Sequence, residues 1–263
     1  MALSPRGVTY FPLAARRRVN HNSVLLTFEL PDPSQCLGLK AGQHVTVCIA
    51  TADAGGGEEG KGKEDGAEVQ VQTVRRAYTP VTPPDVRGKF DLLVKVYPTG
   101  TVSRYLGSLS VGDVVAFSGP GGRFVYKAGD FTRLGMVCGG SGVTPMLQIM
   151  RAIADNPEDK TEVSLIYANV TEEDIMLREE LDEIVRRIGP ARASVYYVLN
   201  DPPATGWEGG VGFVSPEMIK DKMPPAVDDN STRLLFCGPL PMVKAMQDHA
   251  KSLGYPRRAI YKF

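Results

Sequence analysis

The pattern of apolar residues changes near the middle of the chain, and this change limits the fold more than any other feature. Before Gly119-Pro120-Gly121-Gly122, short runs with strand character follow one another, separated by turn residues. After it, strands alternate with helices, beginning with a strand at 134–138 and a helix at 144–154. The sequence therefore predicts an N-terminal β-barrel domain followed by an α/β domain with a parallel sheet.

The expected elements place the boundary between the two domains at residues 127 and 128, giving domains 1–127 and 128–263. Strands are expected at 24–28, 44–49, 90–97, 114–117, 134–138, 163–167, 194–199 and 233–237, and helices at 144–154, 177–188 and 242–252. The segment 51–73 holds Gly55-Gly56-Gly57 and mixed charges with almost nothing to bury, so we expect a mobile hairpin loop there.

Composition excludes several classes of function. The 263 residues, 43% of them hydrophobic, suffice for two ordinary cores, and 30 basic and 30 acidic residues cancel, so no global field attracts nucleic acid or anionic lipid. The four cysteines lack the paired spacing of a zinc site or a redox dithiol, which fits reduced thiols in the cytosol. No apolar run approaches the roughly 20 residues of a membrane span. We expect small molecules or another protein as partners, and no metal.

A glycine-rich turn precedes the first helix of the second half. Cys138-Gly139-Gly140-Ser141-Gly142-Val143-Thr144-Pro145 lies between a predicted strand and a predicted helix. Bare glycines let backbone amides approach a phosphate, and the helix dipole favours negative charge there. The spacing differs from the G-x-G-x-x-G fingerprint, so this turn alone is equally compatible with an ordinary tight turn.

A second turn of the same kind follows the strand 233–237. Cys237-Gly238-Pro239-Leu240-Pro241-Met242 again leads from a strand end into a helix, at the carboxyl edge of the same sheet, where open α/β folds bind ligands. Two such turns favour a binding crevice. Cys237 alone is more typical of buried packing than of chemistry.

Two motifs of the first half suit a ligand with an aromatic ring and phosphates. Arg76-Ala77-Tyr78-Thr79-Pro80 combines a guanidinium, a ring and a hydroxyl, and strand alternation puts Arg76 and Tyr78 on one face. Gly100-Thr101-Val102-Ser103 is typical of a turn entering a short helix, whose free amides and Ser103 hydroxyl suit a phosphate. Taken singly, they are also compatible with an edge strand and an ordinary capped helix.

Taken in order, these four motifs resemble the signature of the ferredoxin-reductase-like flavoproteins, and among them that of the NADH-cytochrome b5 reductases. The similarity extends to Gly42-Gln43-His44, to 93–97, to 167–175 and to Phe263, and so covers nearly the whole chain. The resemblance implies a six-stranded antiparallel β-barrel that binds FAD and a Rossmann-like parallel-sheet domain that binds NADH. It also implies an oxidoreductase that takes hydride from NADH and passes single electrons to a haem protein, with cytochrome b5 as the expected acceptor.

The resemblance further implies roles for single residues. Around FAD, Arg76 would contact the pyrophosphate, Tyr78 and Thr79 the flavin, and Ser103 a phosphate. The remaining residues expected around FAD are Ala77, Val94, Lys95, Tyr97, Gly100, Thr101, Val102 and Thr144. The residues expected on the NADH and nicotinamide side are Lys95, Gly139, Gly140, Ser141, Gly142, Cys237, Gly238, Pro239, Met242 and Phe263.

Three residues are expected to take part in catalysis by the same resemblance: Thr79, His44 and Cys237. His44 resembles a family histidine of a proton-handling network with the Thr79 position, which suits an imidazole that titrates near neutrality, although a lone strand histidine is more often structural. Hydride transfer itself needs no protein acid or base, because the flavin carries that chemistry and the protein supplies placement.

The sequence also departs from the animal members of the family. Thr101 stands where they carry lysine, and the loop between Tyr97 and Gly100 is shorter than theirs. Asn200-Asp201 stands where an acidic residue often repels the extra phosphate of NADPH, which favours NADH. Met1-Ala2-Leu3 offers neither a myristoylation glycine nor an apolar helix. We expect a cytoplasmic protein, with any membrane association supplied by residues or partners outside this chain.

Other hypotheses stay open at this point. The chain could be the flavin portion of a nitrate reductase, which has nearly the same motifs. It could be a non-enzymatic redox sensor, which would bind FAD but turn over slowly. It could also be a small-molecule binding module without flavin, which would be colourless when purified. For an acidic haem acceptor, Arg16-Arg17-Arg18 with Lys95, Arg104 and Arg123 offer a basic docking face, unless these are ordinary solvated charges.

Overall fold

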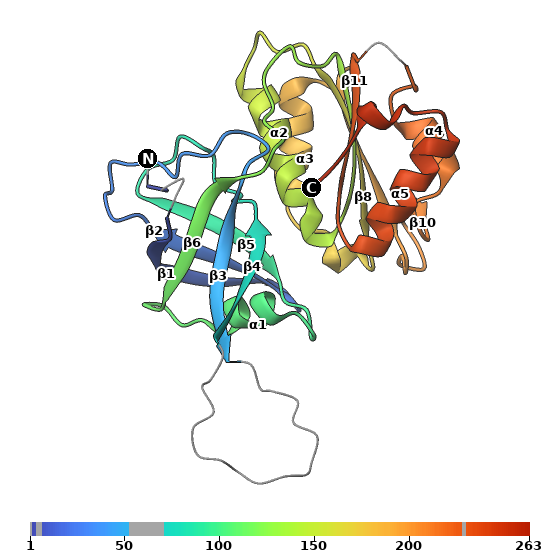
Figure 1. Ribbon diagram of the computed structural model, residues 1–263. Helices are drawn as coiled ribbons and strands as arrows, with labels where there is room; N and C mark the ends of the chain where they lie inside the picture. Colours follow the sequence, from blue (N-terminus) through green and yellow to red (C-terminus); the bar gives the residue numbers. More distant parts are fainter. Residues whose placement is uncertain (1, 4–6, 53–70, 228–229) are drawn as a thin grey trace, which may run out of the picture.

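The protein, seen in a computed structural model, contains two sheets that lie side by side (Figure 1). The structure describes residues 2–3, 7–52, 71–227 and 230–263. The expected hairpin loop falls almost wholly on residues 53–70, which lie outside the described residues. None of the described helices is both long and apolar enough to cross a bilayer.

The N-terminal domain is a single antiparallel sheet of six strands, as expected. Its strands are β1 (Thr9–Asn20), β2 (Ser23–Glu29), β3 (His44–Ala52), β4 (Val71–Tyr78), β5 (Lys89–Lys95) and β6 (Val114–Gly121). They are ordered β4-β3-β6-β1-β2-β5, and every neighbouring pair is antiparallel. Helix α1 (Thr101–Ser108) contacts both β4 and β5, the two ends of this order, so it bridges the two edge strands of the curled sheet.

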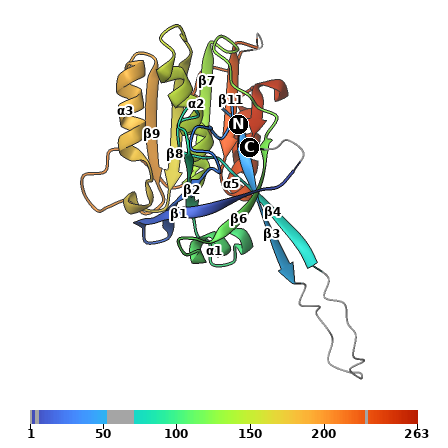
Figure 2. The same ribbon diagram turned by 90° about the vertical axis from the view of Figure 1, so that its left-hand side faces the viewer.

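Four phenylalanines from four strands fill the barrel. Phe11, Phe28, Phe90 and Phe117 come from β1, β2, β5 and β6, and their ring centroids lie 5.0–5.5 Å apart. Alternation along β2 turns Val24, Leu26 and Phe28 inward together, which is why this run forms a strand with one buried face. The packed core holds β4 and the end of β5 in fixed places next to the second domain. Figure 2 shows β3 and β4 extending together beyond the rest of the sheet.

The C-terminal domain is a parallel sheet covered by helices on both faces, as expected. Its strands are β7 (Arg133–Gly139), β8 (Glu162–Asn169), β9 (Ala193–Leu199), β10 (Gly210–Val211), β11 (Thr232–Cys237) and β12 (Ile260–Lys262), and all their pairings are parallel. Helices α2 (Val143–Asp155) and α3 (Arg178–Ile188) lie on one face, and α4 (Pro216–Lys222) and α5 (Leu240–Ser252) on the other (Figure 1). The short 3₁₀ helices are η1 (Gly140–Gly142), η2 (Glu172–Asp174) and η3 (Arg257–Ala259).

The order of these strands creates a switch point beside β7. The sheet runs β10-β9-β8-β7-β11-β12, so the chain moves outward from β7 through β8, β9 and β10 and then returns to the other side of β7. In open α/β sheets ligands bind in the crevice outside the carboxyl ends of the strands at such a point. Both glycine turns singled out in the sequence follow the strands on either side of it, β7 and β11.

The junction between the domains is packed on one side by residues that follow β6. Phe124 and Tyr126 belong to the core of the second domain, and the Tyr126 hydroxyl bonds Asp159 at 2.6 Å and Thr161 at 2.9 Å. The last strand of the first sheet ends at Gly121 and the first of the second begins at Arg133. The predicted boundary between residues 127 and 128 falls in this interval and stays a prediction.

Candidate active site

The two glycine turns touch at the switch point. A Cβ atom on Gly142 would lie 2.6 Å from the carbonyl carbon of Cys237 and 3.0 Å from the nitrogen of Gly238. Gly142 itself has φ −63°, which any residue can adopt, so it is this contact that requires a glycine. A Cβ on Gly139 would lie 2.6 Å from Sδ of Met242 and 3.3 Å from Cδ of Pro239. The structure thus brings most of the predicted NADH residues together.

The start of α2 follows directly on η1, and the Val143 amide donates back to the carbonyls of Gly140 and Ser141. No side chain caps its N-terminus at Gly142, and the hydroxyl of Thr144 instead donates to the carbonyl of Ser141 at 3.1 Å. Gly140 has φ +52°, a left-handed conformation that favours glycine. Bare glycines in front of a helix that has no side-chain cap suit a phosphate, so the residues present fit the pyrophosphate of a dinucleotide.

The strand β4 presents the predicted flavin residues at the end of the first sheet. Arg76 and Ala77 are exposed, whereas Tyr78 and Thr79 are half-buried. Tyr78 packs against the barrel core, and burial raises its pKa to about 12, so its phenol stays protonated. The Arg76 guanidinium donates only to the neighbouring carbonyl of Arg75, at 2.8 Å, among its described hydrogen bonds. The guanidinium therefore remains accessible to a phosphate.

His44 and Thr79 lie at one level of the first sheet. Val45 pairs with Tyr78 on the antiparallel strand, and His44 precedes Val45 while Thr79 follows Tyr78. The imidazole packs against the end of β6, where a Cβ on Gly121 would lie 2.6 Å from Nε2. Burial lowers the pKa of His44, which keeps the ring neutral at neutral pH.

The start of α1 has the free amides that the sequence predicts. Gly100 gives no side-chain cap, and the Ser103 hydroxyl instead closes the preceding turn, accepting from the Tyr97 amide at 3.2 Å and donating to the Gly100 carbonyl at 3.3 Å. Thr101 is exposed. The side chains of Val94 and Val102 are buried in the barrel core, so only their backbone groups are free to serve a ligand.

Residues of both domains meet over the first glycine turn. The position of a Cβ on Gly140 lies 3.8 Å from Cδ of Lys95 and 3.9 Å from the hydroxyl oxygen of Tyr97. Both side chains come from the end of β5 and the turn that follows, in the first domain. The two predicted binding regions therefore form one site.

Cys237 lies in the second glycine turn as a free, half-buried thiol. Burial raises its pKa to about 12, so it is a neutral thiol at neutral pH. Cys138 pairs with it across the sheet and is fully buried, which raises its pKa well above the ordinary value of a thiol. Neither sulfur has the electropositive surroundings of a reactive thiolate.

Phe263 lies at the junction of the domains. Its amide continues the ladder by donating to the Phe236 carbonyl at 3.0 Å, and its ring packs edge-on against Phe124 and Tyr261 at centroid distances of 5.7 and 5.1 Å. The aromatic cluster fixes the chain end, and the predicted role of Phe263 toward nicotinamide stays a prediction.

Sequence reasoning assigned no role to several residues of this region. Gln148 on α2 accepts the amide of Gly42 at 2.6 Å, and Asp174 pairs with Lys95, both across the junction. Three large apolar side chains at the carboxyl edge are exposed: Phe213 at 85%, Leu240 at 85% and Val170 at 48%. For Val170, which directly follows the buried strand β8, an apolar residue at a strand end is the signal that could have identified it.

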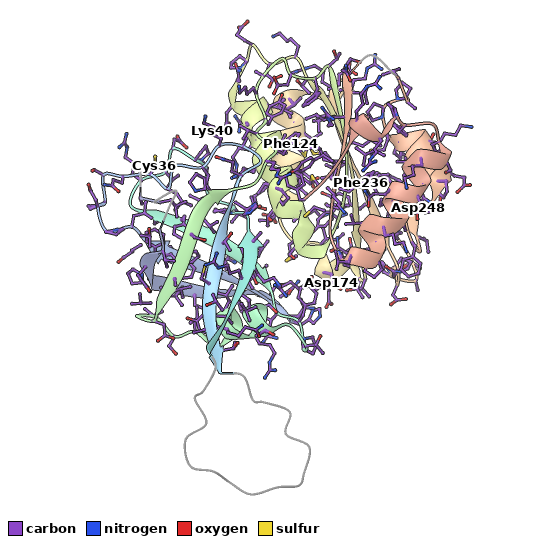
Figure 3. All side chains as sticks on the ribbon, viewed as in Figure 1. Cys36, Lys40, Phe124, Asp174, Phe236 and Asp248 are labelled. Atoms are coloured by element: carbon purple, nitrogen blue, oxygen red, sulfur yellow. The ribbon has the colours of Figure 1, made fainter. Side chains whose placement is uncertain are left out.

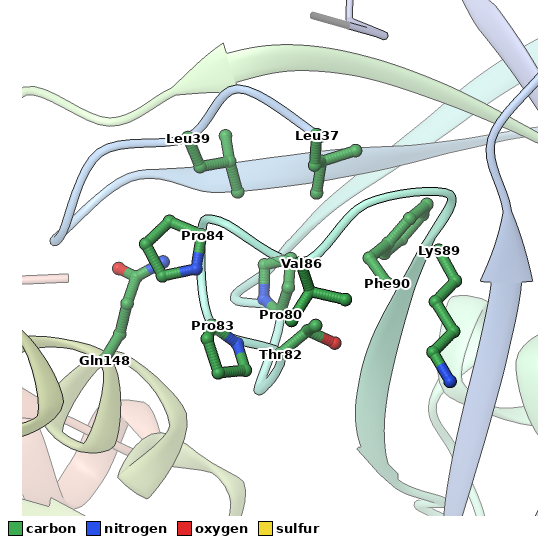
Figure 4. A pocket seen from close by; sticks show the side chains of 10 residues that line it. All are labelled: Leu37, Leu39, Pro80, Thr82, Pro83, Pro84, Val86, Lys89, Phe90 and Gln148. Carbon is green, nitrogen blue, oxygen red and sulfur yellow. The ribbon is translucent and has the colours of Figure 1, made fainter. Parts of the chain in front are cut away.

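A separate pocket lies beside the junction. Its lining is mostly apolar, with Leu37, Leu39 and a proline-rich turn from the barrel and Gln148 from α2 (Figure 4). Its lining includes no residue of the glycine turns. The prediction that a dinucleotide binds at the two glycine turns therefore does not involve this pocket.

Comparison with known proteins identifies the family. Residues 10–56 and 66–126 match the oxidoreductase FAD-binding domain, and residues 136–248 match the oxidoreductase NAD-binding domain. NADH-cytochrome b5 reductase 1 of Debaryomyces hansenii is 44% identical over 255 residues, covering 97% of this chain and 82% of that protein. The protein of the same name from Arabidopsis thaliana is 42% identical over 263 residues, covering 100% of this chain and 86% of its own. The chain belongs to the NADH-cytochrome b5 reductase family.

Membership of the NADH-cytochrome b5 reductase family makes the chain an FAD-dependent oxidoreductase with an NAD nucleotide as its substrate. The cytochrome b5 reductase domain of Ulva prolifera nitrate reductase superposes with a TM-score of 0.85 at 32% identity, covering 100% of this chain and 99% of that one. The predictions of fold, cofactor and enzyme class are thereby confirmed. The roles of single residues stay predictions.

Proposed function

We propose that the protein takes hydride from NADH and passes electrons singly to a haem protein, with cytochrome b5 as the acceptor. One observation carries the proposal: Lys95 and Tyr97 of the FAD domain reach Gly140 in the glycine turn of the other domain. A nucleotide held by that turn then lies against the face of the barrel that carries the flavin residues. When bound, FAD supplies the redox chemistry, accepting a hydride and releasing electrons one at a time.

In this proposal the residues of the FAD domain bind and orient the cofactor. Arg76 binds the FAD pyrophosphate, a charge-assisted contact for which its guanidinium is accessible. The free amides at the start of α1 bind phosphate as well, with Ser103 holding the turn in shape. Tyr78 and Thr79 fix the flavin ring at the end of β4, and His44 supports Thr79 as a neutral imidazole.

The other domain orients the nicotinamide nucleotide. The glycine turn and the start of α2 bind its pyrophosphate, while Cys237 and Pro239 border the nicotinamide. Phe213, Leu240 and Val170 each expose apolar surface at the carboxyl edge of the sheet, where a ring such as adenine can pack. Asp201, exposed and tied by its amide to the Val170 carbonyl at 2.8 Å, places a negative charge at this edge, which favours NADH over NADPH.

Acceptor and location belong to the same proposal. A basic face from Arg16-Arg17-Arg18, Arg104 and Arg123, all exposed, suits an acidic haem protein and makes the docking rate sensitive to salt. We place the protein in the cytoplasm, with any membrane association supplied by residues or partners outside this chain, and with no nucleic acid among its partners.

An anaerobic stopped-flow experiment tests the proposed function. The purified yellow protein is mixed with NADH or NADPH, and oxidised cytochrome b5 is added afterwards. We expect rapid loss of flavin absorbance with NADH, slower loss with NADPH, and then reduction of the haem. Flavin absorbance that falls only slowly with either nucleotide would favour a redox sensor.

The likeness to the Ulva prolifera domain supports a second candidate, the flavin portion of a nitrate-reductase-type system. The acceptor distinguishes the two. Electron transfer to the haem domain of a nitrate reductase at a much higher rate than to free cytochrome b5 would favour the second candidate.

A further inference from the structure

The 3₁₀ helix η2 of the NADH domain docks directly on the FAD domain. Nζ of Lys95 lies 2.9 Å from Oδ1 of Asp174, Nε2 of His21 lies 3.9 Å from the same oxygen, and the Asn20 side chain donates to the Glu173 carbonyl at 3.2 Å. Figure 3 places Asp174 at the end of the NADH domain that faces the barrel. This contact joins parts of the chain separated by 79 residues between Lys95 and Asp174.

Each oxygen of the Asp174 carboxylate serves one domain. Oδ2 accepts from the amide and the hydroxyl of Thr171, both at 3.2 Å, which fixes the side chain within its own domain. Oδ1 is then directed at Lys95 in the other domain. The side chains of Asp174 and Lys95 are only 5% and 14% exposed, so water competes little for this pair.

The pair also controls where the Lys95 side chain lies. The stem of Lys95 passes Gly140 in the glycine turn, and Asp174 holds the ammonium at its far end. An ammonium has three donor hydrogens, so two remain for a ligand while one is bonded to Asp174. Without the carboxylate, a flexible four-carbon stem would no longer be held over the turn.

The opposite side of the junction is held by other contacts. Gln148 accepts from the Gly42 amide at 2.6 Å, and Arg151 donates to the Val81 carbonyl at 2.5 Å. Gly42 packs against Phe124, which lies well apart from Asp174 in Figure 3. The contacts of the described residues thus hold the domains together at two separated places, and the Lys95–Asp174 pair belongs to the one next to the glycine turn.

We propose that Asp174 is a positioning residue for hydride transfer: it latches the two domains together through Lys95 and holds the Lys95 ammonium where the dinucleotide binds. The inference rests on the proposed function, because it assigns the glycine turn to NADH. It predicts that removing the carboxylate weakens nucleotide binding, slows hydride transfer and loosens the FAD domain where η2 docks.

The test compares Asp174→Asn, Asp174→Glu, Lys95→Met and the double variant in the FAD-loaded protein. Calorimetric titration with NAD⁺ gives the dissociation constant, and stopped-flow absorbance gives the rate of flavin reduction by NADH. We expect roughly tenfold weaker NAD⁺ binding in Asp174→Asn, the loss of one charge-assisted hydrogen bond. Asp174→Glu should recover part of the lost NAD⁺ affinity. The double variant should bind NAD⁺ no more weakly than Lys95→Met alone.

Hydrogen exchange supplies a readout that does not depend on the nucleotide. In Asp174→Asn we expect faster exchange both at residues 171–175 and at residues 20–24, which lie in the other domain. A purely local role in capping η2 would speed exchange only at 171–175 and would overturn the latch. Glu173→Gln is the matched control, because it removes an exposed charge from the same helix and should leave exchange, binding and rate unchanged.

The outcomes separate the two proposals. If Asp174→Asn matches the wild-type protein in NAD⁺ affinity, in the rate of flavin reduction and in hydrogen exchange at residues 20–24, the proposed role of Asp174 is wrong. The proposed function is then unaffected. A wild-type protein without affinity for NAD⁺ overturns the proposed function, while the exchange at 20–24 still decides whether the latch exists. If Asp174→Asn does not fold, Lys95→Met carries the same exchange test.

Discussion

At the scale of single residues, burial keeps three titratable side chains of the candidate site uncharged at neutral pH, those of Tyr78, Cys237 and His44. It raises the pKa of Tyr78 and of Cys237 to about 12, and it lowers that of His44. The fixed positive charges that remain there are Arg76 and Lys95, both suited to phosphates and other polar groups of nucleotides. The site therefore offers orientation and anion binding more than acid–base chemistry, which agrees with a flavin enzyme.

Cys237→Ala should slow flavin reduction by NADH without loss of FAD. The side chain lies in the turn that touches Gly142, so its removal disturbs the nicotinamide side and leaves the FAD contacts in place. We expect a decrease of about tenfold, equivalent to about 1.4 kcal/mol, in the stopped-flow rate. Because the thiol is neutral, the wild-type rate should show no ionisation of Cys237 between about pH 6 and 9. Equal rates in the two proteins would contradict this role.

Arg76→Ala should weaken FAD retention. A charge-assisted contact to a phosphate contributes on the order of 1.5–3 kcal/mol, so the variant should lose flavin during dialysis that the wild-type protein withstands. The measurement is the ratio of flavin to protein absorbance before and after dialysis. Arg75→Ala, which removes an exposed neighbouring guanidinium from the same strand, is the control and should keep its flavin. Unchanged flavin content in Arg76→Ala would refute the assignment.

At the scale of elements, the sequence predicts those strands and helices whose apolar residues are periodic. Expected runs at 114–117, 134–138 and 233–237 lie within β6, β7 and β11, and the helix expected at 144–154 is α2. The twelve-residue strand β1 was not expected, because Pro12 and Arg16-Arg17-Arg18 interrupt its alternation. The expected strand at 90–97 ends earlier, at Lys95, where the chain turns toward α1.

Contacts between distant elements could not be predicted in the same way. The meeting of Gly142 with Cys237 depends on the strand order, which places β11 next to β7, and periodicity carries no information on that order. The same holds for Asp174 and Lys95, which lie on different domains. The family resemblance, carried by short motifs, indicated which residues form the site but not which of them touch.

Gly142→Ala should destabilise the meeting of the two turns. Its φ of −63° suits alanine, so any loss comes from the added methyl group against the Cys237 carbonyl, and such overpacking costs about 1–3 kcal/mol. We expect lower denaturant stability together with weaker NAD⁺ binding. Gly112→Ala is the control, because nothing lies within 4 Å of its Cβ position and only its φ of +98° is strained. That variant should lose stability but keep its NAD⁺ affinity.

At the scale of the whole molecule, function requires two domains of different architecture to hold one crevice at a fixed width. Among the described residues, the contacts around Phe124, Gln148 and Arg151 include no ion pair between the domains, whereas the buried Lys95–Asp174 ion pair lies beside the glycine turn. An ion pair responds to pH, whereas apolar packing does not. We therefore expect acidification to weaken the part of the junction that the ion pair holds and to leave the packing around Phe124 unchanged.

The pH dependence of stability should report the Asp174 carboxylate. Burial pushes its pKa upward, but the hydrogen bonds from Lys95 and Thr171 outweigh this and hold the pKa below the ordinary value. A carboxylate with a lowered folded-state pKa adds stability above its unfolded pKa of about 3.9, and this stability is lost as the pH falls through the folded value.

We therefore expect the wild-type protein to have a higher urea midpoint than Asp174→Asn by an amount that is constant between about pH 5 and 8 and shrinks below about pH 4. The asparagine cannot ionise, so the variant lacks this contribution at every pH. Glu173→Gln should follow the wild-type profile, because its side chain is exposed beside the pair. A difference between the wild-type protein and Asp174→Asn that persists unchanged at about pH 2 would show that the substitution acts through packing and not through the charge that joins the domains.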